Sequence, residues 1–389
     1  MNSSQGWTQR LQDMRKELLT LALGIGVLAL LSVSGLLNWL LASEAELIIA
    51  GLVLLGAVVV VLSQQVAEQA ELLAEALGEP YGTLVLTLSV IVIELSLIGS
   101  TMLTGDKNPT LARDSMFSVL MIALTGITGL CMALTSRLSQ QNLDSNEPLS
   151  EEDLSGPNMA GSMVFYNLIS TMSVMVLIIP NFSTDTNEGN FSLPINVVLS
   201  VVSVGVYAIF LVNQMGPYRC FFMDPHERLA SQGGAIDSSG AHSHRPWQSA
   251  GLLVASLAVV VVIAESMGQL IERGVNELQL PGSLAGILVA MLILIPEALN
   301  ALQATRRGQL QRALNTLFGS VLATISLTVP AVLFIGELTG TDVILGLDPA
   351  PMVLLVLTLF LLRPHPKVLG SEGLMLLVVF LFWLVLDLV

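Results

Sequence analysis

The chain has 389 residues, of which 53% are hydrophobic and only 12% are charged. A soluble domain carries about 25% charged residues, so this composition excludes an ordinary soluble protein and indicates that lipid is the solvent. The net charge of −15 excludes a nucleic-acid-binding protein, which needs a basic surface, and two cysteines are too few for a disulfide framework.

Apolar runs long enough to cross a membrane follow one another along the chain. A helix needs about 20 mostly apolar residues to cross the hydrocarbon core. The first run is longer than a signal-peptide core and has no small-residue cleavage site, so we interpret it as a membrane span. The pattern predicts eleven spans, near 18–42, 46–65, 82–104, 115–136, 160–180, 194–216, 249–272, 283–304, 313–336, 350–363 and 371–388. Counts of ten and twelve stay open, because the tenth span is short and the second continues into an amphipathic stretch.

The basic residues predict the orientation of these spans. With the N-terminus in the cytoplasm, twelve Lys and Arg residues lie in inner loops, against three in outer loops, which are Lys107, Arg113 and Arg273. This is the bias that the positive-inside rule describes. We therefore expect a cytoplasmic N-terminus and an external C-terminus, in a bacterial inner (plasma) membrane.

A weak internal repeat relates the two halves of the chain. Residues 62–80 align with 263–281 at an offset of 201 and without a gap, which places Glu71 on Glu272. The next helix of each half carries one acid in an apolar run, and these acids are Glu94 and Glu297.

The correspondence continues in the following helix, where Thr125 falls on Ser326. Spans 2–6 and 7–11 are five helices each, so the second set enters the membrane from the opposite side, as in the inverted repeats of secondary transporters. We thus predict an all-α integral membrane protein with one extra helix and two inverted five-helix repeats. The expected parts are an N-terminal tail and extra helix (1–45), a first repeat (46–216), a cytoplasmic linker (217–248) and a second repeat (249–389).

Glu94 and Glu297 carry the expected chemistry. An ionised carboxylate at the bilayer centre costs about 2.5–3.5 kcal/mol on insertion scales. Neither acid has a basic residue within one or two turns on its own helix face. Such a group avoids the cost by taking up a proton or by binding a cation. Two facing acids that alternate between these states constitute an exchanger, so both are candidate cation- and proton-binding residues and candidate metal ligands.

Further candidates are neutral oxygen ligands and acids near the ends of the spans. Pro296 removes a backbone donor beside Glu297 and frees a carbonyl oxygen. The leading candidate neutral ligands are Ser96, Ser118, Asn300 and Asn315, and the further hydroxyl candidates are Ser100, Thr125, Ser320, Thr324 and Ser326. For the serines the alternative is a hydrogen bond back to their own helix. Glu71 and Glu272 are interpreted either as acids flanking the entrances or as part of a solvated face, and Glu265 as a proton relay or a boundary residue.

Other chemistry finds little support. No HExxH helix, P-loop or CxxC pair is present, and the four histidines lie in predicted loops. We therefore expect no enzymatic activity, no catalytic residue and no cofactor, and as partners a metal cation, protons and the lipid bilayer. Nothing in the sequence predicts the oligomeric state.

Two stretches resemble a known family. Residues 78–122, with SVIVIE ending at Glu94, and the residues from Pro281, with LILIPE ending at Glu297, are similar to the two signature repeats of ChaA-type calcium/sodium/potassium–proton antiporters. These belong to the cation/calcium exchanger superfamily. The resemblance implies a fold of one plus five plus five helices, with both glutamates as shared cation and proton sites. Better-known members carry GNxxE at each acid, which this chain lacks, so the choice among Ca²⁺, Na⁺ and K⁺ stays open.

The sequence thus predicts a cation/proton antiporter that exports Ca²⁺, with Na⁺ and K⁺ next, by alternating access around Glu94 and Glu297. A cation channel and a non-transporting membrane subunit are the alternatives. A channel relies on a selectivity filter, and no filter-like sequence is visible.

Overall fold

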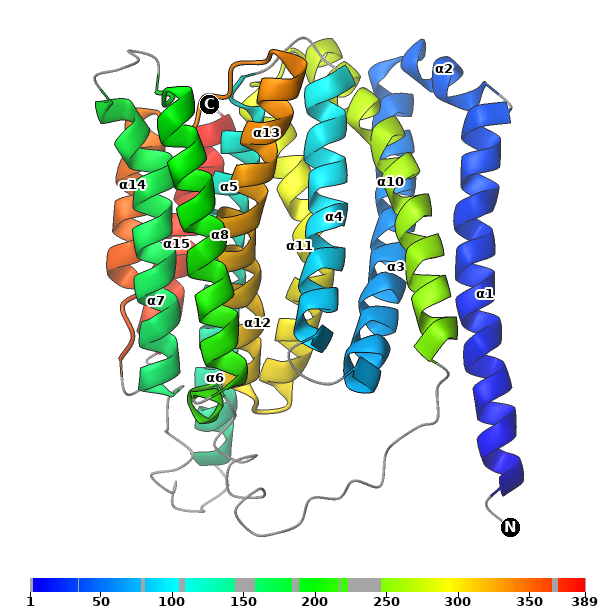
Figure 1. The fold of residues 1–389 in the computed structure, drawn as a ribbon, viewed down its shortest axis with the longest axis horizontal. Coiled ribbons are helices and arrows are strands. Elements are labelled where there is room, and N and C mark those ends of the chain that lie inside the picture. The colour runs from blue at the N-terminus through cyan, green and yellow to red at the C-terminus, as the bar shows by residue number, and fades with distance from the viewer. Residues whose placement is uncertain are drawn as a thin grey trace. The chain divides into compact units, whose positions relative to one another are not determined.

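The protein is all-α, as the sequence predicted. The computed structural model describes residues 3–33, 35–77, 81–104, 109–143, 158–183, 189–216, 218–222, 246–365 and 370–388. Within these ranges every regular element is a helix, and no strand occurs (Figure 1). The expected linker at 217–248 lies largely outside the described residues.

The helices follow the predicted spans closely. In the first half they are α1 (Ser3–Val33), α2 (Leu36–Leu41), α3 (Ala45–Leu77), α4 (Tyr81–Thr104), α5 (Leu111–Met121), η1 (Ile122–Ile127), α6 (Thr128–Leu143), α7 (Met159–Ser173), η2 (Val174–Ile178), η3 (Ile179–Phe182), α8 (Leu193–Met215) and η4 (Arg219–Phe221). In the second half they are α10 (Pro246–Glu277), α11 (Ser283–Arg306), α12 (Leu310–Ala323), η5 (Thr324–Thr328), α13 (Val329–Thr339), α14 (Pro349–Leu361) and α15 (Gly370–Leu388). The segments η1, η2 and η5 are π-helical, while η3 and η4 are short 3₁₀ turns.

The length and composition of the helices make this an integral membrane protein. Among the described residues, 8 helical stretches are long and apolar enough to cross a membrane. Two shorter apolar helices, Leu88–Gly99 and Pro349–Leu361, fall within the third and tenth predicted spans. The count of eleven spans stays a prediction.

The first predicted span, 18–42, is interrupted. The helix α1 ends at Val33, and α2 begins at Leu36 after Gly35, whose φ is 66°. Glycine adopts this left-handed conformation without the steric penalty of a Cβ, so it ends a helix that an apolar pattern alone would continue.

The chain forms two compact units, each built from two separate stretches. Unit 1 comprises Met1–Asp106 and Ser243–Leu280, and unit 2 comprises Lys107–His242 and Pro281–Val389. Each unit therefore takes helices from both predicted repeats. In unit 1, α4 packs against α3 and α10, which also pack against each other, and α1 packs against α10 and α3 (Figure 1). The boundaries of the predicted repeats stay a prediction.

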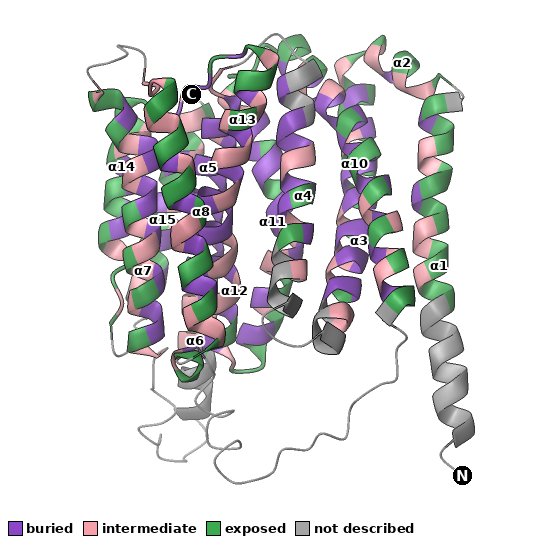
Figure 2. Cartoon of the chain, in the orientation of Figure 1, coloured by how far each residue is buried: buried purple, intermediate pink, exposed green. Residues whose placement is uncertain are grey.

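Unit 2 is organised around the long helix α5–η1–α6. In this span, Leu111–Arg137, 72% of the most apolar window is buried, against 28% for Leu193–Met215 in α8. Figure 2 shows the same contrast between buried residues on α5 and exposed residues on α8. The helix α11 packs against α5, η1, α6 and α12, and α15 packs against α6 and η1. The α5–η1–α6 helix is thus enclosed by protein, while α8 presents much of its surface outward.

The π-helical segments support the internal repeat. In each half, the third helix of the predicted repeat is interrupted by one of them, namely η1 and η5. Thr125 and Ser326, which the sequence alignment pairs, both lie inside these segments. π-Helical insertions are rare, so their occurrence at matched positions is difficult to attribute to chance.

Arg113 holds the start of α5 to the segment that precedes α14. Its Nε lies 2.8 Å from Oδ1 of Asp114, its Nη1 donates to the carbonyl oxygen of Gly346 at 2.8 Å, and its Nη2 lies 3.1 Å from Oδ2 of Asp348. Only 7% of Arg113 is exposed. Arg113, which the topology prediction assigned to an outer loop, is therefore a buried structural residue, and each of its three guanidinium nitrogen atoms has a partner.

Gly286 allows α11 to cross α5 closely. A Cβ built on Gly286 would lie 2.8 Å from the backbone C of Asp114 and 2.8 Å from the backbone N of Ser115. These are backbone atoms, which cannot turn aside as a flexible side chain could. The crossing fixes the register of the helix that carries Glu297.

We expect Gly286→Ala to destabilise the protein by about 1–3 kcal/mol, because overpacking at a backbone contact forces the helices apart. The melting temperature of the purified protein measures the effect. Gly205→Ala on α8 is the matched control, since nothing lies within 4 Å of a Cβ built there. Equal melting temperatures for the two variants would contradict the close crossing.

Candidate functional site

Glu94 lies on α4 in unit 1 and is almost completely buried. Only 1% of the residue is exposed, and it is flanked by apolar residues such as Ile93 and Leu97. Because α4 packs against both α3 and α10, unit 1 encloses this helix on two sides. The placement agrees with the expectation of an acid deep within an apolar span.

Glu297 lies on α11 in unit 2, immediately after Pro296. The helix continues through this proline from Ser283 to Arg306. The carboxyl atom Oε2 of Glu297 is buried and has no hydrogen-bond partner among the described residues. A buried carboxyl oxygen without a donor is costly unless a proton or a cation occupies it.

Counted along the two helices, Glu297 is level with the π-helical segment η1. The helix α11 contacts α5, η1 and α6, so it runs parallel to this long helix from the crossing at Gly286. Glu297 is eleven residues beyond Gly286, and Thr125 is eleven residues beyond Asp114. Glu297 is therefore level with the middle of η1, where the regular backbone pattern is interrupted.

The two candidate serines bond to their own helices. Oγ of Ser96 donates to the carbonyl oxygen of Val92 at 2.5 Å, and Oγ of Ser118 donates to that of Asp114 at 2.7 Å. This is the arrangement that the alternative interpretation predicted for them. Because each hydroxyl donates, its oxygen retains lone pairs, and its role as a cation ligand stays a prediction.

The two candidate asparagines have different surroundings. Asn300 is exposed on α11. Asn315 on α12 donates from Nδ2 to the carbonyl oxygen of Phe222 at 2.5 Å, and its Oδ1 accepts from Nε2 of Gln311 at 2.8 Å. Gln311 in turn accepts from the backbone N–H of Asn158 at 2.6 Å. Both polar ends of Asn315 are engaged in a network that joins α12 to the start of α7 and to the end of η4.

Sequence reasoning did not find this network. Gln311 and Asn158 had no assigned role, because nothing in the sequence indicates that residues 153 positions apart are in contact. The sequence feature that could have indicated the network is Gln311, a polar residue one turn before Asn315 on the same helix face.

We expect Asn315→Ala to lower the melting temperature by an amount that corresponds to about 1–3 kcal/mol, because two partly buried hydrogen bonds are lost. The cation concentration that gives half-maximal transport should stay within about twofold, since no ligand is removed. A tenfold increase in that concentration with an unchanged melting temperature would instead identify Asn315 as a cation ligand. Thermal unfolding and transport of the same preparation separate these outcomes.

The candidate entrance and relay acids all lie in unit 1. Glu272 is half-buried near the end of α10, and Glu265 is exposed in the middle of that helix. Glu71 lies on α3, but its side chain is outside the described residues. Their roles as entrance or relay residues stay predictions.

The candidate site residues are thus divided between the units. Unit 1 holds Glu94, Ser96 and the three entrance or relay acids, and unit 2 holds Glu297, Asn300, Asn315 and Ser118. The joint site of the two glutamates remains a prediction. Among the described residues, no group of three or more His, Cys, Asp or Glu residues is arranged to hold a metal ion.

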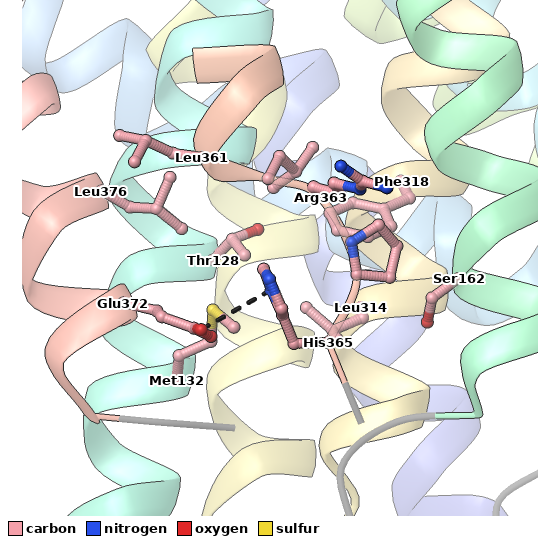
Figure 3. Close-up of a pocket in the computed structure, with 12 residues that line it drawn as sticks. Thr128, Met132, Ser162, Leu314, Phe318, Leu361, Arg363, His365, Glu372 and Leu376 are labelled. Carbon is pink, nitrogen blue, oxygen red and sulfur yellow. Dashed lines mark ion pairs between the residues drawn. The ribbon is translucent and has the colours of Figure 1, made fainter. Parts of the chain in front are cut away.

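A separate small pocket of about 40 Å³ lies in unit 2 among α6, α7, α12, α15 and the end of α14. Nδ1 of His365 lies 3.6 Å from Oε1 of Glu372 at this pocket, as the dashed line in Figure 3 marks. Thr128 and Ser162 also line it. The pocket has room for one or two water molecules.

Both cysteines are free thiols. Cys131 on α6 is buried, while Cys220 on η4 is exposed. Cys220 is two residues before the carbonyl group that Asn315 binds.

Comparison with known proteins gives the class of the molecule. The family model described as "Sodium/calcium exchanger protein" matches residues 47–216 and 248–389. The sodium-potassium/proton antiporter ChaA of Escherichia coli (strain K12) is 34% identical over 303 residues, which cover 76% of this chain and 76% of that protein. The putative ionic transporter y4hA of Sinorhizobium fredii is 31% identical over 294 residues, 75% of each chain.

Solved structures share the fold. The selenium-substituted Ca²⁺/H⁺ antiporter protein YfkE superposes with a TM-score of 0.65 at 15% identity, covering 96% of this chain and 99% of that chain. The H⁺/Ca²⁺ exchanger CAX gives 0.63 at 14% identity, covering 96% and 88%.

The helices and these relatives define an integral membrane cation antiporter, a transporter rather than a catalytic enzyme. The chain belongs to the sodium/calcium exchanger family, which confirms the resemblance to ChaA-type antiporters within the cation/calcium exchanger superfamily.

Proposed function

We propose that this protein is a cation/proton antiporter in which Glu94 and Glu297 bind protons and a metal cation in turn. The observation that carries the proposal is the burial of Glu94 and of the Oε2 atom of Glu297 within apolar helices. A bound cation and a bound proton compete for the same oxygen atoms. Cation entry then requires proton release, which couples the two fluxes.

Na⁺ or K⁺ is the cation that we now favour over Ca²⁺, which the sequence analysis ranked first. Ca²⁺ takes 6–8 oxygen ligands. Asn300 is exposed and Asn315 is engaged at both polar ends, which leaves few neutral oxygen ligands for Ca²⁺. The relative at 34% identity is named a sodium-potassium/proton antiporter, which supports the same choice.

Transport would proceed by alternating access, with the inverted repeats exposing the glutamates to one side of the membrane at a time. We place the protein in a bacterial inner membrane with its N-terminus in the cytoplasm. The inward proton gradient then drives cation export.

We expect Glu94→Gln and Glu297→Gln each to reduce cation-dependent proton flux at least 100-fold in proteoliposomes, because an amide cannot exchange a proton for a cation. Flux is measured with an internal pH dye after a cation gradient is imposed. Glu337→Gln on α13 is the matched control, since this glutamate is exposed and should be dispensable. Normal exchange in either of the first two variants would reject the mechanism.

We also expect the wild-type protein in proteoliposomes to release protons when Na⁺ or K⁺ is added, with a saturable rate. Ca²⁺ should produce a response at least tenfold weaker at the same concentration. A strong response to Ca²⁺ alone would instead identify Ca²⁺ as the transported cation. Cation current that does not saturate and is not coupled to protons would favour a channel instead.

A further inference from the structure

The helices α7 and α12 lie side by side in a defined register. The backbone N–H of Asn158 donates to Oε1 of Gln311 at 2.6 Å, a pair separated by 153 residues. Seven residues further along each helix, the rings of Phe165 and Phe318 meet edge to face with centroids 6.0 Å apart. The same offset at two levels shows that the helices run parallel.

Ser173 and Ser326 are separated by the same 153 residues as Asn158 and Gln311. Each serine lies fifteen residues beyond the first contact, and α7 packs against η5, the segment that contains Ser326. Both helices change to π-helix at this level, since η2 begins at Val174 and η5 spans Thr324–Thr328. Ser173 and Ser326 are therefore level with each other at an irregular part of both backbones.

Three serine hydroxyl groups near this level have no hydrogen bond among the described residues. Oγ of Ser173 and Oγ of Ser326 are buried without a hydrogen bond among the described residues, and both residues are 0% exposed. Oγ of Ser170, one turn earlier on α7, is likewise buried without a partner. Each dry hydroxyl would cost about 1–3 kcal/mol. Other buried hydroxyls avoid this cost by bonding to their own helix, as Ser203 does to Leu199 at 2.7 Å.

At the counterpart of this place, between α14 and the start of η1, the hydroxyl groups have partners. There Thr125 corresponds to Ser326, and its hydroxyl donates to the carbonyl oxygen of Met121. On α14, the hydroxyl of Thr358 contacts Sδ of Met121 at 3.6 Å. At the offset of 201, Leu322 replaces Met121, and leucine offers no sulfur atom. Thr125 and Thr358 therefore have partners, while the hydroxyls of Ser170, Ser173 and Ser326 have none among the described residues.

The chemistry of the surroundings selects a neutral ligand. In the described residues 158–183, 189–216 and 310–339, the single acidic residue is Glu337, which is exposed. A cation enclosed there would have no counter-charge, and an isolated ion in the membrane interior is costly. Water both donates and accepts, and buried water typically makes about three hydrogen bonds to groups that otherwise lack partners.

We propose that Ser170, Ser173 and Ser326 form an internal water-binding site between α7 and η5, and that no such site exists at the counterpart between α14 and the start of η1. The proposed site contains neither Glu94 nor Glu297. It lies eight residues, or about 12 Å, further along α12 than Phe318. A bound water satisfies the three hydroxyls and the irregular backbone at the start of η2.

X-ray radiolytic labelling of the full-length protein in nanodiscs tests the proposal, because a bound water yields a hydroxyl radical in place. Met172 precedes Ser173 of the proposed site and is 2% exposed. Met121, at the counterpart between α14 and the start of η1, is 0% exposed. Oxidation is quantified by mass spectrometry of the peptides. We expect Met172 to be oxidised at least fivefold faster than Met121. Equal, slow rates at the two methionines would overturn the proposal.

Variants make the test specific. Ser173→Ala combined with Ser326→Ala should reduce the Met172 rate to that of Met121, and Thr358→Ala should leave the Met172 rate unchanged. If the double variant fails to fold, Ser326→Thr replaces it. The introduced threonine can bond to its own helix as Thr125 does and should slow Met172 oxidation in the same way. Persistent oxidation of Met172 in a folded variant would overturn the assignment of these serines.

Discussion

A carboxyl group surrounded by apolar helices cannot keep its charge without a partner, and the proposed function depends on this constraint. Glu94 is nearly inaccessible on α4, and an oxygen of Glu297 on α11 is buried without a donor. The sequence offers neither acid a nearby lysine or arginine. In the proposed mechanism a proton or a cation binds there in turn, and the transmembrane gradients of the two ions set the direction of exchange.

The surroundings of Glu297 combine rigid and irregular parts. Gly286 and the Arg113 network fix α5 and α11 at one end of unit 2, and Asn315 ties α12 to the residue that follows η4. Between these fixed points lie the π-helical segments η1 and η5. Regular helix holds the elements in register, while the interrupted backbone leaves carbonyl and hydroxyl groups available for water or ions.

Much of this arrangement follows from the sequence, because lipid imposes simple rules. Apolar length predicted the helices and the membrane location, and lone acids in apolar runs identified Glu94 and Glu297 as the chemically unusual residues. Short-range patterns failed where a conformation depends on a single backbone angle, as at Gly35, or where a side chain is used by a distant segment, as for Asn315 and Arg113. Hydropathy carries no information about such pairings. The division into two compact units that mix the two repeats could not be predicted from the sequence either, because it arises from tertiary packing.

The unequal burial of the two thiols has a practical consequence. Cys131 is enclosed within unit 2, whereas Cys220 is accessible on η4. The native chain therefore carries one addressable attachment point for a maleimide dye, two residues from the carbonyl that Asn315 holds. A fluorophore there would report on the junction of α8 and α12 during turnover without any engineered cysteine.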